Sequence, residues 1–142
     1  MPEFPIGEAA RQSGVKVATI RYYEQIGLLP KPPRTEGNRR AYAYEDVERL
    51  AFIRHSRELG FELDQIRALL TLQDHPDQAC READAIARAR LAEVEEKIAS
   101  LSALKAELER MVEGCSHGRV ETCRVIGILA DHGKCKHHHQ AA

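Results

Sequence analysis

The feature that most constrains this chain is a long helical run over residues 81–113, READAIARARLAEVEEKIASLSALKAELERMVE. The run contains no proline or glycine, and strong helix formers such as alanine, leucine and glutamate dominate it. Its apolar residues recur every three or four positions and form a narrow seam: Leu91, Val94, Ile98, Leu101, Leu104, Leu108 and Met111. A narrow seam on such a long helix is typical of a coiled coil, so the run predicts a helix that pairs with a like helix.

Because cysteines stand at both ends of this run, its length allows a prediction about how two chains assemble. Cys80 precedes the run and Cys115 follows it. At about 1.5 Å per residue, a continuous helix would hold the two cysteines roughly 50 Å apart, so they cannot share a site within one chain. In an antiparallel homodimer, the start of one helix lies beside the end of its partner. Cys80 of one chain would then meet Cys115 and Cys123 of the other, and a metal ion held there would bridge two subunits.

Length and composition limit the class of protein. A chain of 142 residues can form one small domain with an appended element. No apolar run approaches the roughly 18 residues of a membrane span, and the N-terminus has no signal pattern, so we expect a cytoplasmic protein with no membrane partner. Reducing conditions disfavour disulfides, and the four cysteines therefore point to metal or redox chemistry.

The N-terminal part carries a helix-turn-helix pattern. Residues 6–13, IGEAARQS, and residues 16–26, KVATIRYYEQI, are both compatible with short helices, and Gly14 ends the first. In a helix-turn-helix, the second helix enters the major groove of DNA. The segment RTEGNRRAY, residues 34–42, follows three prolines and contains a Gly-Asn pair, which predicts a basic hairpin that touches phosphates. Residues 43–72 have the amphipathic spacing of two further helices.

Taken together, these motifs resemble the winged-helix domain of the MerR family of transcriptional regulators. The resemblance rests on TIRYYEQIGLL at 19–29, RTEGNRRAY at 34–42 and LGFELDQIRALL at 59–70. It implies a mainly α chain: a winged helix-turn-helix domain over 1–74 and a hinge with an antiparallel coiled-coil dimerisation helix over 75–114. A metal-binding loop with a short helix would follow over 115–133, and a Cys/His-rich tail over 134–142.

The resemblance also implies which residues contact DNA or support that contact: Lys16, Thr19, Arg21, Tyr22, Tyr23, Arg34, Asn38, Arg39, Arg40 and Tyr42. Arginine and tyrosine side chains suit phosphate oxygens, and phosphate contacts set register rather than sequence. Neighbouring residues on a helix point about 100° apart, so one of the two adjacent tyrosines belongs to the core.

The resemblance carries Cys80, Cys115 and Cys123 over as metal ligands, with Cys80 supplied by the partner subunit. Three thiolates favour a divalent ion, and in this family a cysteine at the position of Cys80 accompanies sensing of zinc, cadmium, lead or mercury. The loop CSHGRVETC is most similar to the cadmium- and lead-responsive branch, and His117 is a possible fourth ligand. A structural zinc, or cysteines that are merely buried, are the alternatives. Iron–sulfur members carry four cysteines in this loop, and here there are two.

The C-terminal tail, KCKHHHQAA, forms a second group of metal-binding side chains: Cys135, His137, His138 and His139. It is either a second, exposed metal site or a disordered, weakly chelating segment.

We therefore expect a metal-responsive regulator rather than an enzyme. The resemblance implies that the homodimer sits on promoter DNA and that a divalent ion (Cd, Pb, Zn or Hg) makes it distort the DNA, so that RNA polymerase engages at metal resistance and efflux genes. The rival function is a thiol-redox or metal-sequestering protein with structural zinc. An organic-ligand regulator of the same fold would carry a large extra C-terminal domain.

Overall fold

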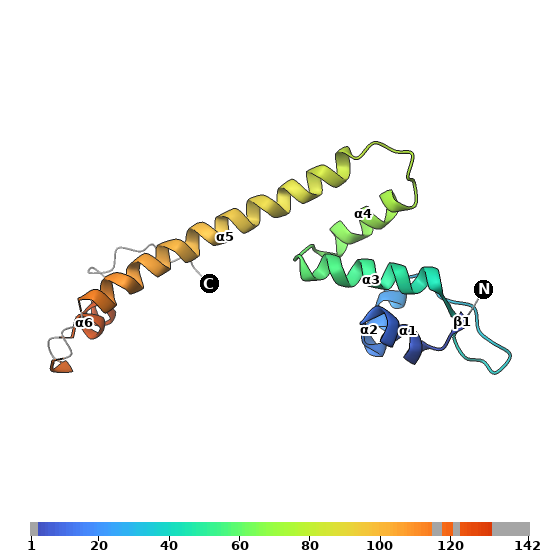
Figure 1. The fold of residues 1–142 in the computed structure, drawn as a ribbon, viewed down its shortest axis with the longest axis horizontal. Coiled ribbons are helices and arrows are strands. Elements are labelled where there is room, and N and C mark those ends of the chain that lie inside the picture. Colours follow the sequence, from blue (N-terminus) through green and yellow to red (C-terminus); the bar gives the residue numbers. More distant parts are fainter. Residues whose placement is uncertain (1–2, 115–117, 121–122, 132–142) are drawn as a thin grey trace. The chain divides into compact units, whose positions relative to one another are not determined.

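The computed structural model of this chain describes residues 3–114, 118–120 and 123–131 (Figure 1). The elements are, in chain order, β1 (Glu3–Phe4), α1 (Ile6–Ser13), α2 (Val17–Gln25), β2 (Tyr42–Ala43), α3 (Tyr44–Glu58), α4 (Leu63–Gln73), α5 (Arg81–Glu113) and α6 (Arg124–Ala130). The fold is mainly α, as the sequence predicts. The chain divides into two compact units, residues 1–87 and 88–142, and α5 runs from the first into the second.

The helix-turn-helix consists of α1 and α2 and confirms the predicted helix over residues 6–13. Helix α1 begins after Pro5, whose carbonyl accepts hydrogen bonds from the N–H groups of Glu8 and Ala9, both at 3.0 Å. It ends at Gly14, which adopts the left-handed conformation with φ 75° and donates its N–H to the carbonyl of Ala10. A side chain at residue 14 would be strained, and its Cβ would lie 3.0 Å from Nε of Arg54. Glycine therefore fixes the turn that leads into α2.

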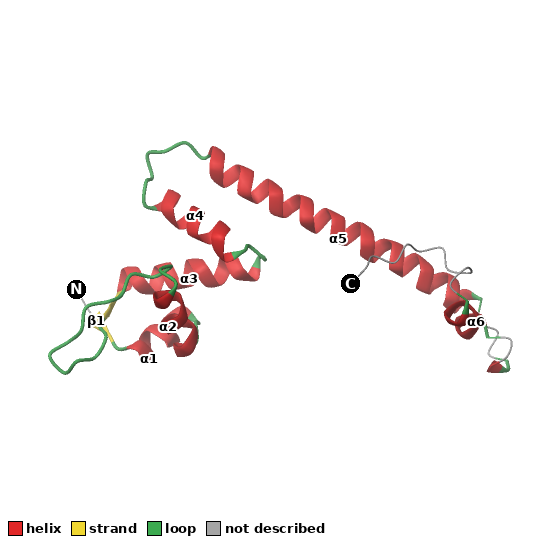
Figure 2. Cartoon of the chain, turned by 180° about the vertical axis from the view of Figure 1, so that it is seen from behind, coloured by secondary structure: helices red, strands yellow, loops and turns green. Residues whose placement is uncertain are grey.

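The segment between α2 and β2 forms the hairpin that the sequence predicts, here called the wing (residues 33–42). Residues Arg34 and Arg40 form an antiparallel bridge, and the N–H of Thr35 donates to the carbonyl of Arg39 at 2.7 Å. Asn38 turns the chain with φ 61°, a left-handed conformation that asparagine tolerates better than most residues. The wing then continues into β2, which pairs antiparallel with β1 (Figure 2). The strand β1 was not predicted from the sequence.

Helices α3 and α4 complete the core of the first unit, as expected for residues 43–72. Leu50 and Ile53 of α3 and Ile66 of α4 have no exposed surface. Burying one such side chain stabilises the fold by about 1.5–3 kcal/mol. A side chain in the first turn of each helix accepts a hydrogen bond from the backbone N–H just before the helix. Asp46 accepts from Ala43 at the start of α3, and Gln65 accepts from Glu62 at the start of α4. These helices form the support on which α1 and α2 pack.

Two arginines attach the end of α2 to this support. Arg49 of α3 donates from Nε to the carbonyl of Leu28 at 3.0 Å, and Arg67 of α4 donates to the carbonyl of Ile26 at 2.8 Å. Both carbonyls lie just past Gln25, the last residue of α2, so the two bonds fasten the segment that follows the helix. They hold the second helix of the motif in a fixed position relative to α3 and α4.

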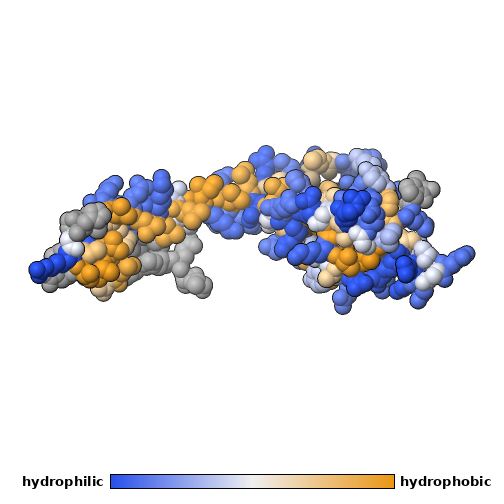
Figure 3. All heavy atoms as spheres, turned by 60° about the horizontal axis from the view of Figure 1, so that its bottom comes forward, coloured by the Kyte–Doolittle hydropathy of each residue, from blue (hydrophilic) through white to orange (hydrophobic). Residues whose placement is uncertain are grey.

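Helix α5 matches the predicted bounds of the long helix and leaves most of its apolar seam in solvent, although Met111 near its end is buried. Leu91, Leu101 and Leu108 are each more than half exposed, and hydrophobic atoms line this helix in Figure 3. The N-terminal end of α6 lies against the end of α5, and Ile128 of α6 is buried. None of the helices described is long and apolar enough to cross a membrane.

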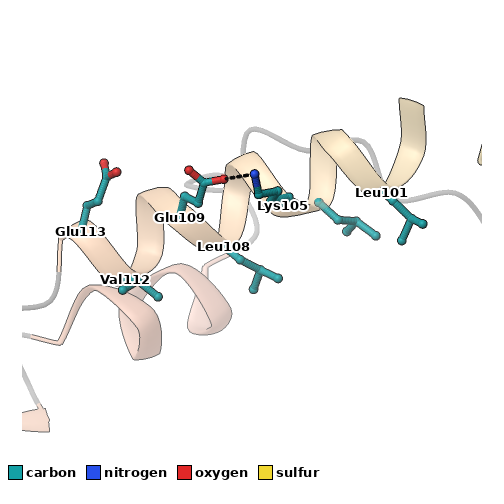
Figure 4. Close-up of a pocket in the computed structure, with 7 residues that line it drawn as sticks. Leu101, Lys105, Leu108, Glu109, Val112 and Glu113 are labelled. Atoms are coloured by element: carbon teal, nitrogen blue, oxygen red, sulfur yellow. Dashed lines mark ion pairs between the residues drawn. The ribbon is translucent and has the colours of Figure 1, made fainter. Parts of the chain in front are cut away.

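The last turns of α5 form an apolar groove of about 590 Å³. Figure 4 shows Leu101, Leu108 and Val112 on one side of the helix and Glu109 on the other. Glu109 makes an ion pair with Lys105 at 3.5 Å. These leucines form an exposed apolar face next to charged side chains that remain in solvent.

Candidate DNA interface and metal-binding loop

A basic groove of about 460 Å³ lies between α2 and the wing. Arg21 comes from α2, and the other polar side chains that line the groove come from the wing: Arg34, Asn38, Arg39 and Arg40. Arginine presents several N–H donors in a planar array that matches phosphate geometry. The groove therefore collects positive charge where helix and wing meet, which suits a nucleic-acid backbone.

Hydrogen bonds within the wing hold two of these arginines. Arg34 donates from Nη1 to the carbonyl of Asn38 at 3.1 Å, and the N–H of Arg39 donates to Oγ1 of Thr35 at 3.3 Å. The side chains of Arg21, Arg34 and Arg39 are otherwise exposed. A turn fixed in this way presents its charges with less loss of conformational entropy on binding.

Helix α2 presents three more of the predicted contact residues. Lys16 is exposed immediately before the first turn, Thr19 is half-buried, and Tyr22 is 47% exposed. The side chains at the start of this helix are those that reach base edges in helix-turn-helix proteins. All three are accessible.

Tyr23 and Tyr42, which were also predicted for the interface, lie in the core instead of facing solvent. Tyr23 is 8% exposed, its ring centroid lies 6.0 Å from that of Tyr22, and burial raises its pKa. Tyr42 has no exposed surface. Neither ring therefore offers more than a small part of its surface to solvent.

Next to Arg40 of the groove lies a buried carboxylate that was not predicted from the sequence. Glu24 of α2 is 4% exposed and accepts a hydrogen bond from the hydroxyl of Tyr42. Its Oε2 lies 3.3 Å from Nε of Arg40. Burial, together with the Glu24 carboxylate, raises the pKa of Tyr42, so the hydroxyl stays protonated and remains a donor. The available signal was spacing: Glu24 follows the buried Ile20 by one helical turn and so shares its inward face.

The structure places two of the predicted metal ligands beyond opposite ends of α5. Cys80 is exposed and precedes the helix, and Cys123 is half-buried at the start of α6. The other predicted ligands lie outside the described residues: Cys115, His117, Cys135, His137, His138 and His139. Within the described part of the chain, no three His, Cys, Asp or Glu residues gather closely enough to hold a metal ion.

Close packing joins the two ends of the cysteine loop. Gly114 precedes Cys115, and Arg124 follows Cys123. A Cβ on Gly114 would lie 1.8 Å from Cδ of Arg124, so the two residues pack directly against each other. The chain thus returns to the end of α5 after the loop.

A helix-turn-helix, a wing and an arginine-lined groove between them define a winged-helix DNA-binding protein. Residues 4–73 match the family described as MerR HTH family regulatory protein, and residues 47–111 match the family described as MerR, DNA binding. The chain belongs to the MerR family of transcriptional regulators.

Individual relatives agree with this assignment over nearly their whole length. The chain is 42% identical over 130 residues to the HTH-type transcriptional regulator ZntR of Escherichia coli K12, covering 89% of this chain and 92% of that protein. It is similar to the transcription regulator PbrR691 from Ralstonia metallidurans CH34 in complex with lead(II), with TM-score 0.75, 39% identity, and 89% and 98% of the two chains covered. It is also similar to MerR from Bacillus megaterium MB1 in complex with mercury(II), with TM-score 0.68, 33% identity, and 90% and 100% covered.

Proposed function

We propose that this protein is a metal-responsive transcriptional regulator that binds promoter DNA as a homodimer. The observation that carries the proposal is the geometry of α5. An apolar face lies open along this helix, and Cys80 and Cys123 stand beyond its two ends. A helix of 33 residues is about 50 Å long, so thiolates at its two ends serve one ion only if they come from different chains.

The exposed seam supports an antiparallel pair of α5 helices. Leu101, Leu104 and Leu108 are between 40% and 65% exposed in the single chain, and a second copy of the helix would cover them. In that pairing, Cys80 of the partner subunit approaches Cys115 and Cys123 of the first. The dimer would then hold two equivalent sites, one at each end of the paired helices.

The donor set determines the kind of ion. Three thiolates around a divalent ion leave a net charge near −1, which a protein site accommodates, and sulfur ligands favour soft metals. Cadmium, lead, zinc and mercury are the candidates, supported by the lead and mercury complexes of the two similar structures. His117 would add a nitrogen ligand, and the tail residues Cys135, His137, His138 and His139 would form a separate, exposed group.

The basic groove is the proposed DNA contact, through Arg21, Arg34, Asn38, Arg39 and Arg40. Lys16, Thr19 and Tyr22 lie on the same recognition helix and would reach the major groove. When bound, the metal would join thiolates of two chains and favour one arrangement of the two DNA-binding units over the other. The response would be read out as deformation of promoter DNA that allows RNA polymerase to engage at metal resistance genes.

Titrating promoter DNA with the protein, with and without each candidate metal, tests the proposal. We expect the metal to change DNA distortion and transcription while the dimer stays bound. The matched control is the Cys115→Ser/Cys123→Ser variant, which should bind DNA but show no metal response. If binding, distortion and transcription were all indifferent to the four metals, a thiol-redox or metal-sequestering function would be the better account.

A further inference from the structure

We infer that Glu24 is a positioning residue for DNA binding: its buried carboxylate aims the Arg40 guanidinium at the phosphate groove. The inference rests on the proposed function, since it assigns a role to a residue behind the proposed phosphate contacts. The observation behind it is a buried carboxylate that pairs with Arg40, one of the four arginines that line the groove.

The Glu24 carboxylate is held from both sides. Oε1 accepts a hydrogen bond from the hydroxyl of Tyr42, a residue with no exposed surface. Oε2 is buried, and within the described part of the chain it has no hydrogen-bond partner of good geometry, although Nε of Arg40 lies 3.3 Å away. A buried carboxylate without compensation costs free energy, so its attraction to Arg40 offsets part of the cost of burying Oε2.

Arg40 therefore has two tasks that separate along its side chain. Nε of the guanidinium lies 3.3 Å from the Glu24 carboxylate, while the Arg40 side chain also lines the groove and is 30% exposed. An arginine fixed at Nε still offers the N–H groups of both terminal nitrogens to a phosphate. Glu24 lies on the recognition helix, and Arg40 and Tyr42 lie in the wing. The same three side chains thus lock helix and wing into one rigid unit, which reduces the entropy lost when DNA binds.

The direction in which DNA affinity changes when the charge of Glu24 is removed distinguishes a positioning role from a purely electrostatic one. Glu24→Gln keeps the size of the side chain and a carbonyl acceptor for Tyr42, but it removes the negative charge. If Glu24 only lowers the positive potential of the groove, the variant binds DNA more tightly. If Glu24 positions Arg40, the variant binds more weakly although the protein has become more positive.

The assay is binding to random-sequence double-stranded DNA over a range of salt concentrations, because phosphate contacts do not depend on sequence. We expect Glu24→Gln to weaken binding about tenfold, the equivalent of one charge-assisted hydrogen bond, and to reduce the salt slope by about one. In the Arg40→Ala background, Glu24→Gln should cause no further loss. The matched control is Glu36→Gln, which removes an exposed carboxylate from the same wing and should leave affinity unchanged or slightly raised.

Tighter or unchanged binding by Glu24→Gln would overturn the inference, and so would an equal loss in the Arg40→Ala background. If Glu24→Gln lowers the melting temperature, Tyr42→Phe is tested instead, alone and combined with Arg40→Ala. This variant keeps the ring in the core but removes the hydroxyl that donates to the Glu24 carboxylate. A smaller loss that vanishes in the Arg40→Ala background supports the inference, and a loss that persists there refutes it. Failure of the proposed function is distinguishable, because the variants Arg21→Ala, Arg34→Ala and Arg39→Ala would then leave binding and salt slope unchanged as well.

Discussion

Truncating Leu108 in the exposed seam should weaken the dimer without disturbing the DNA-binding unit. Leu108 is 57% exposed in the single chain. Full burial of a leucine contributes about 1.5–3 kcal/mol, so covering the exposed part contributes about 1–2 kcal/mol per side chain. A homodimer contains two copies, and Leu108→Ala should therefore cost about 2–4 kcal/mol of association free energy. This corresponds to roughly a thirtyfold to thousandfold increase in the dimer dissociation constant.

Sedimentation equilibrium over a series of protein concentrations measures this constant directly. Glu109→Ala is the matched control, because this charged side chain at the edge of the groove points away from Leu108 and makes an exposed ion pair with Lys105 (Figure 4). Such pairs contribute about 0–1 kcal/mol, so the control should leave the dimer nearly unchanged. Equal effects of the two substitutions, or no effect of Leu108→Ala, would show that the seam is not the dimer interface.

Four further changes test the fold and the DNA interface. Leu50→Ala removes a fully buried side chain of α3 and should lower the free energy of unfolding by about 2–5 kcal/mol in denaturant titrations. Gly14→Ala should cost about 1 kcal/mol or more in the same assay, because the residue has φ 75°. The hydrogen bonds from Arg11 and Gln12 lower the pKa of Glu8 from 4.5 to about 2. A lowered pKa contributes stability above pH 4.5 that is lost as the pH falls toward 2. NMR titration of the Glu8 carboxyl should show the lowered pKa, and Arg11→Ala should raise that pKa toward 4.5. Arg39→Ala should reduce the salt slope of DNA binding by about one, and an unchanged slope would remove Arg39 from the interface.

Local patterns were enough to predict most of the helices. The run over residues 81–113 has no residue that breaks a helix, and Gly114 follows it, so its bounds in the structure agree with the prediction. The end of α1 was equally predictable, because only a residue that tolerates positive φ suits the turn at Gly14. In both cases the information lies within a few consecutive residues.

The missed features depend on partners that are distant in the sequence. Strand β1 exists because Phe4 pairs with Tyr42, and a two-residue strand has no periodicity of its own. Glu24 was missed because its partners, Arg40 and Tyr42, belong to the wing. Tyr42 was predicted at the DNA interface from its motif, yet its ring fills the core and its hydroxyl reaches inward to Glu24.

The proposed metal site depends on a still more distant partner, a second chain. Spacing identified Cys80, Cys115 and Cys123 as candidates. Cys80 is too far from the other two along the helix for one chain to supply all three ligands of one ion. The length of the helix supports a site shared between chains, because 33 helical residues separate the two ends by about 50 Å.

Cadmium binding by mixed dimers tests the shared site most directly. A chain carrying Cys80→Ser is combined with a chain carrying Cys115→Ser/Cys123→Ser, the heterodimer is isolated with two different affinity tags, and thiolate-bound cadmium is counted by its ultraviolet charge-transfer absorbance. If the ligands come from opposite subunits, each variant alone has no complete site, and the heterodimer binds one cadmium ion with the affinity of the unmodified protein. A heterodimer without such a site, or with two, would contradict the account.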